Sequence, residues 1–319
     1  MDLHEVADPR RAAAQPRIVV VGHLARDLVL SVEAAPEAGE SVDAHERREM
    51  LGGNGGNQAV ALAQLGAWVA LMAVVGDDRI ADDLRDQAHR DRVDVSLVIR
   101  RPGVASGMVL ELLDADGRWR YVQDISQVSL SRADVDARGP ALDAADAVLV
   151  QLQQPPEVAL AVARRAKAGG ALVVLDGVPG DGILAHADVL RADDHETELV
   201  TGVPVDDVDG VRDVARGLLD AGPRLVALGV GKAGNLFVWR DPAGELLLPL
   251  TDEEAVDTTG GGDAFVAALT VSLARGRSPG DAARLAAAAA GATVARVGGR
   301  PDLTEEALAD RVERLRRYT

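Results

Sequence analysis

The chain has 319 residues, no cysteine and a formal net charge of −17, with 34 Lys and Arg against 51 Asp and Glu. Hydrophobic residues make up 47% of it, which excludes a disordered chain, and no apolar run approaches the roughly 18 residues of a membrane span, so we expect no membrane partner. The acidic charge and the 2% of aromatic residues argue against a nucleic-acid partner, while the lack of cysteine excludes thiolate metal sites and fits a cytoplasmic location.

The segment 1–17 is charged and lacks the apolar stretch of a signal peptide, so we expect a loose tail before a single domain at 18–319. In that domain short β-branched runs alternate with longer Ala-rich stretches. The pattern predicts, in chain order, a strand at 18–21, a helix at 57–65, a strand at 69–75, a helix at 80–89, a strand at 147–152, a helix at 157–168, a strand at 172–175, a helix at 211–221, strands at 224–228 and 235–239, and helices at 262–275 and 281–297. Such alternation indicates βαβ units and an α/β fold with a mostly parallel sheet.

Two stretches interrupt this alternation. Residues 28–50 show little helical pattern, and residues 101–124 contain two strand-like runs around the turn at 114–117 (DADG). Neither stretch fits the core of a parallel sheet. We therefore expect the two to form a small separate sheet that acts as a lid.

The segment AVDTTGGGDAFVAA at 255–268 has the clearest chemical content. Its glycines, Gly260, Gly261 and Gly262, precede Asp263, which opens an Ala-rich helix. Glycines let the backbone approach a ligand closely, and the N–H groups at the start of a helix bind anions. A carboxylate beside an anion site suits phosphoryl transfer, because it can accept the proton of the attacking hydroxyl. Taken alone, the segment also fits a glycine turn with Asp263 as an ordinary helix cap.

A second glycine-rich segment, GGNGGNQA at 52–59, also leads into a helix. Four glycines and two asparagines make a polar loop that a hydroxyl-rich ligand could approach closely. The alternative interpretation is a flexible turn with Asn57 as the N-cap of the helix.

The segment GVGKAG at 229–234 matches the dinucleotide-binding pattern G-x-G-x-x-G. That pattern requires a helix directly afterwards, whereas the following residues, NLFVW, are typical of a strand. Lys232 is not followed by Ser or Thr as in a Walker A loop. We therefore reject a dehydrogenase or P-loop function.

The acidic segment DDHE at 193–196 has two open interpretations. Carboxylates three residues apart on one helical face could hold water on Mg²⁺, a hard cation that prefers oxygen ligands. Alternatively, Asp193 and Glu196 form a capping box at the start of a helix.

Taken together and in this order, the segments resemble the ribokinase-like, PfkB-type family of carbohydrate kinases over about 18–301. Two signatures carry the resemblance: GGNGGNQA followed by LGAWVALMAVVGDD (65–78), and DTTGGGDAF (257–265), which is close to the family pattern DTxGAGDxF. The resemblance implies a three-layer α/β/α fold with a small β-sheet lid, through which ribokinases commonly dimerise. It also implies ATP as co-substrate, with Mg²⁺.

The resemblance assigns roles to individual residues. It implies that Asp263 is the catalytic base and that the backbone of 260–262 is the anion hole. The residues implied to bind the sugar are Asp27, Gly53, Asn54, Asn57 and Gln153, together with Asp263. Those implied on the nucleotide side are Asp193, Gly229, Gly231, Lys232 and Gly234 for ATP, Glu196 for Mg²⁺ through water, and Asp257 and Thr259 for a monovalent cation such as K⁺.

Several residues depart from the pattern that ribokinases share. Asn54 and Gly56 replace the lysine and alanine of GGKGANQA, Ala25 replaces an asparagine, and Gln153 replaces a glutamate. On the nucleotide side, Asp193 replaces an asparagine and Gly229 a threonine. The loss of a polar partner in a sugar pocket changes discrimination strongly, so the resemblance does not identify ribose as the substrate.

The sequence therefore predicts ATP-dependent phosphorylation of a primary hydroxyl of a furanose sugar, with a homodimer formed through the lid. One alternative is a nucleoside kinase, which Gly56 and Ala25 would favour if they widened the pocket. The alternative from another class is a protein that senses a sugar or nucleotide without turnover.

Overall fold

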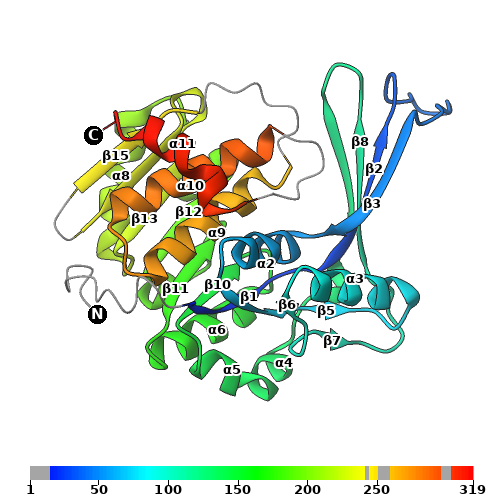
Figure 1. Ribbon diagram of the computed structural model, residues 1–319, viewed down its shortest axis with the longest axis horizontal. Coiled ribbons are helices and arrows are strands. Elements are labelled where there is room, and N and C mark those ends of the chain that lie inside the picture. The colour runs from blue at the N-terminus through cyan, green and yellow to red at the C-terminus, as the bar shows by residue number, and fades with distance from the viewer. Residues whose placement is uncertain (1–14, 241–243, 251–258, 296–302, 319) are drawn as a thin grey trace.

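A nine-stranded sheet runs through the centre of the molecule, in the order β15-β14-β13-β12-β11-β10-β1-β4-β6 (Figure 1). The computed structural model describes residues 15–240, 244–250, 259–295 and 303–318. Every neighbouring pair from β13 to β6 is parallel, whereas β14 is antiparallel to both of its neighbours. The strands are β1 (Arg17–Val21), β4 (Trp68–Met72), β6 (Val93–Asp94), β10 (Ala147–Gln151), β11 (Leu172–Asp176), β12 (Val189–Ala192), β13 (Leu225–Gly229), β14 (Asn235–Trp239) and β15 (Gly244–Leu248).

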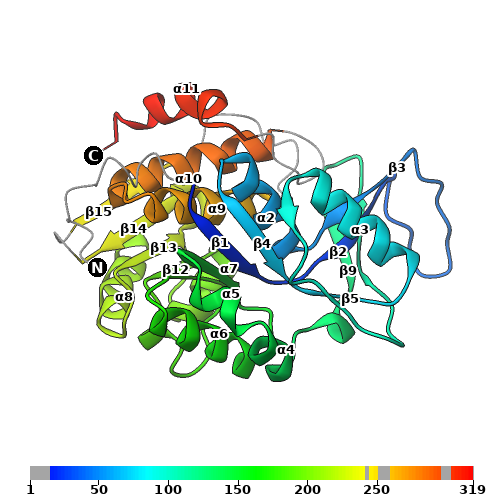
Figure 2. The same cartoon turned by 60° about the horizontal axis from the view of Figure 1, so that its bottom comes forward.

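Helices cover both faces of this sheet, as the two views show (Figures 1 and 2). One face carries α2 (Asn54–Gln64), α3 (Arg79–Arg90), α9 (Gly261–Ala274), α10 (Pro279–Val294) and α11 (Glu305–Leu315). The other carries α4 (Arg132–Ala137), α5 (Gly139–Asp143), α6 (Pro156–Ala168) and α8 (Val208–Asp220). The short helix α7 (Asp194–Thr201) follows β12. This is the three-layer α/β/α arrangement that the family resemblance implies.

Burial on both faces explains the continuous apolar strands. In β1, Ile18 and Val20 pack into one layer of helices, while Val19 and Val21 pack into the other. A strand buried on both sides needs apolar residues at every position, because successive side chains point to opposite faces. The central strands are therefore runs of Val, Leu, Ile and Ala, and few aromatic residues are needed to fill the core.

A separate four-stranded sheet projects from one end of the molecule, in the order β3-β2-β8-β9 (Figure 1). Its strands are β2 (Ala25–Ser31), β3 (Glu46–Gly52), β8 (Gly107–Leu113) and β9 (Trp119–Asp124). The turn at 114–117 joins β8 to β9, and Gly117 N–H donates to Asp114 O at 2.9 Å. The two stretches that interrupt the βαβ pattern thus meet in one small sheet, as predicted. The sheet spans 25–52 rather than 28–50 in its first segment.

Two local predictions differ from the structure. The single strand expected at 69–75 is broken at Ala73: β4 ends at Met72, and β5 (Val74–Val75) pairs with β7 (Ile99–Arg100) in a separate two-stranded sheet. At this break Ile99 N–H donates to the Ala73 carbonyl at 2.8 Å. Beyond Ala73 the chain therefore pairs with β7, whereas β4 pairs with β1 and β6. Of the tail predicted at 1–17, residues 1–14 lie outside the described residues, and Arg17 already belongs to β1.

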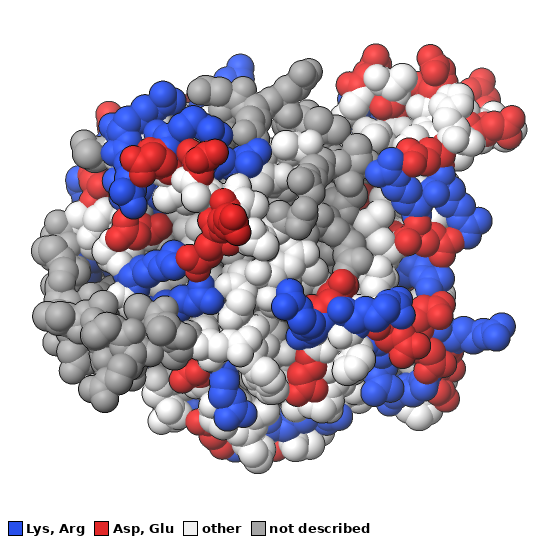
Figure 3. Space-filling model, in the orientation of Figure 1, with Lys and Arg blue, Asp and Glu red and all other residues white. Residues whose placement is uncertain are grey.

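The surface bears interspersed charges. On the face in Figure 3, acidic side chains gather at the outer end of the small sheet, and Lys and Arg side chains gather near α11, whereas the middle of this face carries few charges. None of the described helices is long and apolar enough to cross a membrane.

Candidate functional site

The predicted site residues gather at the carboxyl ends of the central strands, between α2, α9 and the small sheet. Ligands of open parallel sheets bind at this edge, because strands stop there and helices begin. The chain passes from β1 into β2, from β3 into α2, and from β12 into α7 along this edge. Residues far apart in sequence therefore meet there.

The loop before α2 holds the carboxylate of Asp27 in place. A Cβ atom at Gly52 would lie 1.8 Å from Asp27 Oδ2, so only glycine leaves room for this carboxylate. Gly53 is the N-cap of α2 with a φ of 74°, a conformation that L side chains rarely adopt, and its N–H donates to Asp27 Oδ1 at 3.3 Å. Asp27 and Gly53 thus lie together, and Asn54 begins the helix beside them. The alternative interpretation of Asn57 as the N-cap is wrong, because Gly53 holds that position.

The helix α9 begins at the second glycine-rich segment. Gly260 is its N-cap in the left-handed conformation, with a φ of 73°, and no side chain caps the helix. Asp263 lies in the first turn and is 8% exposed. Its Oδ2 accepts from Asn57 Nδ2 at 3.2 Å, and its Oδ1 accepts from Gln58 Nε2 at 3.0 Å. Asp263 is therefore not a helix cap: its carboxylate is held away from the helix by two amides of α2.

Three residues that sequence reasoning missed complete this network. Gln58 Nε2 also donates to Asp176 Oδ2 at 2.8 Å, at the end of β11. The other oxygen of that carboxylate accepts from Arg191 Nη1, at the end of β12, at 2.9 Å. Arg191 in turn lies over the ring of Phe265, 5.7 Å from its centroid. A continuous buried chain thus runs from Arg191 through Asp176 and Gln58 to Asp263.

This environment sets the proton affinity of Asp263. Burial, reinforced by the nearby charge of Asp176, raises the pKa of Asp263 from 3.8 to about 7, although the hydrogen bonds from Asn57 and Gln58 oppose the rise. Burial also raises the pKa of Asp176, against the pull of Arg191. A carboxylate with a pKa near neutrality can take up a proton during a reaction and release it afterwards.

The start of α7 contains the reciprocal capping box that the sequence left open. Asp193 Oδ1 accepts from Glu196 N–H at 2.8 Å, and Glu196 Oε2 accepts from Asp193 N–H at 2.9 Å. Burial, with the nearby charge of Asp176 as the next cause, raises the pKa of Glu196. Oε1 of Glu196 lies 3.4 Å from the position that a Cβ atom at Gly177 would occupy. The capping box thus uses one oxygen of Glu196 and directs the carboxylate toward the strand ends.

Asp194, which sequence reasoning did not single out, joins α7 to the loop at 229–234. Its Oδ1 accepts from Gly231 N–H at 3.1 Å, and a Cβ atom at Gly229 would lie 2.3 Å from that oxygen. This contact explains Gly229 in place of a threonine, because no side chain fits there. Lys232 is exposed on the same loop, and Gly234 ends it before β14. A strand follows the loop, so the rejection of a dinucleotide-binding loop is confirmed.

Three predicted residues remain: Thr259, Asp257 and Gln153. Thr259 Oγ1 lies 3.4 Å from Oε2 of Glu111, a buried carboxylate of β8. Asp257 lies outside the described residues. Gln153 is exposed, and Gln154 beside it is buried with its Oε1 accepting from Leu130 N–H at 2.9 Å. Gln153 lies two residues beyond the carboxyl end of β10.

Gly56 does not widen a ligand pocket. A Cβ atom there would meet Leu51 Cδ2 at 3.0 Å and Leu24 Cδ1 at 3.2 Å, both in the apolar core. Ala25 is buried against Gly107 of the neighbouring strand β8. Gly56 therefore gives no support to the nucleoside kinase alternative, because its neighbours are leucines of the core.

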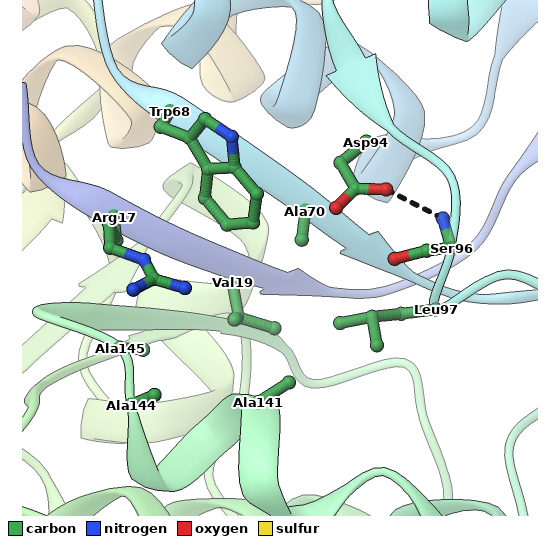
Figure 4. A pocket seen from close by; sticks show the side chains of 10 residues that line it. All are labelled: Arg17, Val19, Trp68, Ala70, Asp94, Ser96, Leu97, Ala141, Ala144 and Ala145. Atoms are coloured by element: carbon green, nitrogen blue, oxygen red, sulfur yellow. Dashed lines mark hydrogen bonds between the residues drawn. The ribbon is translucent and has the colours of Figure 1, made fainter.

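Among the residues that the structure describes, no group of three or more His, Cys, Asp or Glu side chains could hold a metal ion. A hollow of about 80 Å³ lies between β1, β4 and α5, lined by Arg17, Trp68, Asp94 and small apolar residues (Figure 4). Arg17 and Trp68 begin their strands. The hollow is thus remote from the carboxyl ends where Asp263 lies.

Comparison with known proteins shows the family to which the chain belongs. The sequence profile of the pfkB family carbohydrate kinases matches residues 15–306. The ribokinase of Staphylococcus aureus is 27% identical over 263 residues, covering 81% of this chain and 86% of that protein. The deoxyribokinase of Salmonella typhi is 30% identical over 256 residues, covering 78% and 83%.

Solved structures share the fold. The ribokinase of Thermotoga maritima superposes with a TM-score of 0.78 at 26% identity, covering 95% of this chain and 99% of that one. The residues that the family profile matches, 15–306, include the central sheet, the small sheet and both glycine-rich segments. The chain therefore belongs to the pfkB family of carbohydrate kinases and is an ATP-dependent sugar kinase with a ribokinase-like fold.

Proposed function

We propose that the protein transfers the γ-phosphoryl group of ATP to a primary hydroxyl of a furanose sugar, with Asp263 as the base. The observation that carries this proposal is the position of Asp263, which lies buried in the first turn of α9, directly after three glycines, with a pKa of about 7. An acceptor of protons is thus placed beside backbone N–H groups that suit an anion. The ribokinase and deoxyribokinase relatives favour a pentose as the acceptor.

The chemistry follows from these positions. The sugar hydroxyl attacks the γ-phosphorus, its proton passes to the Asp263 carboxylate, and the bond between the γ-phosphorus and the bridging oxygen of ADP breaks. The N–H groups at 260–262 would donate to the oxygens of the transferred group. Asp27 would accept hydrogen bonds from other sugar hydroxyls. The small sheet above them would exclude water, which otherwise competes with the sugar for the phosphoryl group.

Mg²⁺ would enter this site bound to ATP rather than being held by protein ligands alone. Glu196 fits the binding of Mg²⁺, because its carboxylate lies at the edge of the site. Mg²⁺ keeps several of its own water molecules, and a carboxylate can hold the cation through them. Bound Mg²⁺ would neutralise phosphate charge. For K⁺, Thr259 and the backbone around it are the proposed ligands. The use of ATP favours the cytoplasm as the location.

The proposal is tested by measuring ADP release with Mg²⁺ and ATP across ribose, deoxyribose, fructose, adenosine and inosine, with and without K⁺. Strong release with one furanose sugar is the expected result. Release with a nucleoside alone would favour the nucleoside kinase. ATP binding by calorimetry without release on any acceptor would favour a sensor over an enzyme.

The pH dependence of turnover should depend on Asp176. Because Asp263 must be ionised to accept a proton, kcat/KM should fall as the pH drops below about 7. Asp176→Asn removes the neighbouring negative charge while keeping an acceptor for Arg191, so the pKa of Asp263 should fall. The acidic limb of the kcat/KM profile should therefore move to lower pH. An unchanged limb would show that another group controls it.

We propose that the protein forms a dimer through the outer face of the small sheet. Alternation along the strands places Leu28, Leu30, Met108, Leu110, Leu112 and Val122 on the face opposite Asp27 and Glu111. Met108 and Val122 are exposed, and the four leucines are half-buried. Exposed apolar patches of this kind mark interaction surfaces.

Light scattering should give twice the monomer mass of 33.3 kDa for the wild type. Val122→Arg should shift the mass to that of the monomer, because a charge would be buried in the interface. Leu199→Arg, which changes a similarly exposed apolar residue of α7, should leave the dimer intact. A monomeric wild type, or a Val122→Arg variant that stays dimeric, would contradict the interface.

A further inference from the structure

Arg191 lies against the start of α9, where the transferred phosphoryl group is proposed to bind. A Cβ atom at Gly262 would lie 2.7 Å from Arg191 Nη2 and 3.2 Å from Nη1, so the guanidinium occupies the space that a side chain would need. Gly262 itself is partly exposed, whereas Gly261 and Asp263 on either side are buried. The guanidinium therefore borders the accessible edge of the anion hole.

Two contacts fix the orientation of this side chain. Nη1 donates to Asp176 Oδ1 at 2.9 Å, and the guanidinium plane lies over Phe265. The Arg191 side chain is 14% exposed and that of Asp176 is 6% exposed. An arginine held at one nitrogen by a buried carboxylate keeps its other nitrogens in a fixed direction, and here Nη2 is on the side of Gly262.

The charge of Arg191 is maintained among the carboxylates of the site. Burial alone would lower its pKa, but Asp176, Glu196 and Asp193 together raise it. The guanidinium thus stays charged while it lies between the capping box of α7 and the glycines of α9. The sugar loop carries Asn54 where ribokinases have a lysine, so that position supplies no cation here.

We propose that Arg191 contacts the transferred phosphoryl group directly, with the Nη2 side of its guanidinium donating to a non-bridging oxygen. The proposal rests on the proposed function and adds a side-chain donor to the backbone donors of 260–262. A charged donor there would stabilise the negative charge on the phosphoryl oxygens as the bond to ADP breaks. The proton still passes to Asp263.

The test compares nucleotides that differ in the γ-phosphoryl group. Calorimetry would measure the binding of ADP and of a non-hydrolysable ATP analogue, both with Mg²⁺, to the full-length protein. Because loss of Arg191 leaves Asp176 buried without a cation, the double variant Arg191→Met/Asp176→Asn is compared with Asp176→Asn alone. The double variant should bind the ATP analogue about 10- to 100-fold more weakly than the single variant, with ADP binding unchanged.

Turnover supplies a second readout. Relative to Asp176→Asn, the double variant should lose about 100-fold in kcat while KM for the sugar stays the same. Free guanidinium should restore part of the kcat, because it can occupy the vacated space. Arg191→Lys should give an intermediate kcat, since lysine keeps the charge but not the two-nitrogen fork.

Arg275 provides the matched control at the other end of α9. Its side chain is 11% exposed and it pairs with Glu305, so Arg275→Met removes a comparable half-buried arginine without touching the site. This variant should keep wild-type kcat and nucleotide binding, whatever its effect on the melting temperature.

The outcomes separate the two proposals. If the wild type binds both nucleotides and the double variant shows no selective loss of affinity for the ATP analogue, the role of Arg191 is overturned. The proposed function is then left intact. Equal weakening of ADP and of the analogue would also overturn it, because a purely structural residue would act on both. Wild type that binds neither nucleotide would overturn the proposed function and, with it, the role of Arg191.

Discussion

Asp263→Asn should lower kcat by about 10²- to 10⁴-fold, with little change in KM for either substrate. The substitution keeps the shape of the side chain and its ability to accept from Gln58, but removes the group that takes up the proton. Because the N–H groups of α9 and the carboxylate of Asp27 are unchanged, binding should persist. The measurement is steady-state kinetics on the preferred sugar. Near-wild-type kcat in this variant would show that Asp263 is not the base.

The free energy of unfolding, measured for the wild type and for Asp263→Asn, tests whether the loss of activity reflects a loss of folding. The pKa of Asp263 is raised in the folded state, so its ionisation destabilises the protein as the pH rises from about 4 to about 7. At about 1.4 kcal/mol per pKa unit, replacing it with Asn should stabilise the fold by at most about 4 kcal/mol above pH 7, and by little at pH 4. Asp188→Asn alters another buried aspartate at the opposite end of the sheet, so it should leave kcat unchanged.

Asp27→Ala should raise KM for the sugar about 10- to 100-fold, because a charged acceptor contributes about 1.5–3 kcal/mol to a hydrogen bond. The carboxylate lies over Gly52 and accepts from Gly53 N–H, so it is held in one direction before the sugar arrives. KM for ATP should not change. The effect is measured by kinetics at saturating ATP.

Glu49→Gln is the control for Asp27. Glu49 lies on β3 of the same small sheet, where it pairs with Arg26 and Arg47 on the opposite face. Its substitution should therefore leave KM for the sugar unchanged. Equal effects of the two variants would indicate that the whole sheet, rather than the Asp27 carboxylate, was disturbed.

Local patterns were sufficient to predict an α/β class with a mostly parallel sheet and the two glycine-rich segments that meet at the site, whereas the three-layer arrangement was implied by the family resemblance. The continuous apolar runs, such as 18–21, specify strands buried on both faces, and the glycines at 260–262 specify the start of α9. These features depend on neighbours in sequence. The resemblance then associated Asp263 with the loop at 52–59, and the structure brings Asp263 together with Asn57 and Gln58.

The rest of the network depends on the packing of distant segments. Gln58 lies 118 residues from Asp176 and 205 residues from Asp263, and these contacts require that α2 packs beside β11 and α9. The contact of Asp176 with Arg191 requires the register of β11 against β12. No local pattern distinguishes Asp176 or Arg191 from other charged residues at strand ends. The orientation of Gly56 toward the core depends on the helical phase of α2, which the sequence of the loop does not determine.

The most direct test of the account is the position of the phosphoryl group in the product. The preferred sugar would be converted with ATP, and the product analysed by phosphorus NMR with proton coupling. We expect one sugar phosphate whose phosphorus couples to the two protons of a terminal CH₂ group, together with an equal amount of ADP. Phosphate on a ring hydroxyl, or inorganic phosphate released without a sugar phosphate, would contradict the transfer that Asp263 is proposed to catalyse.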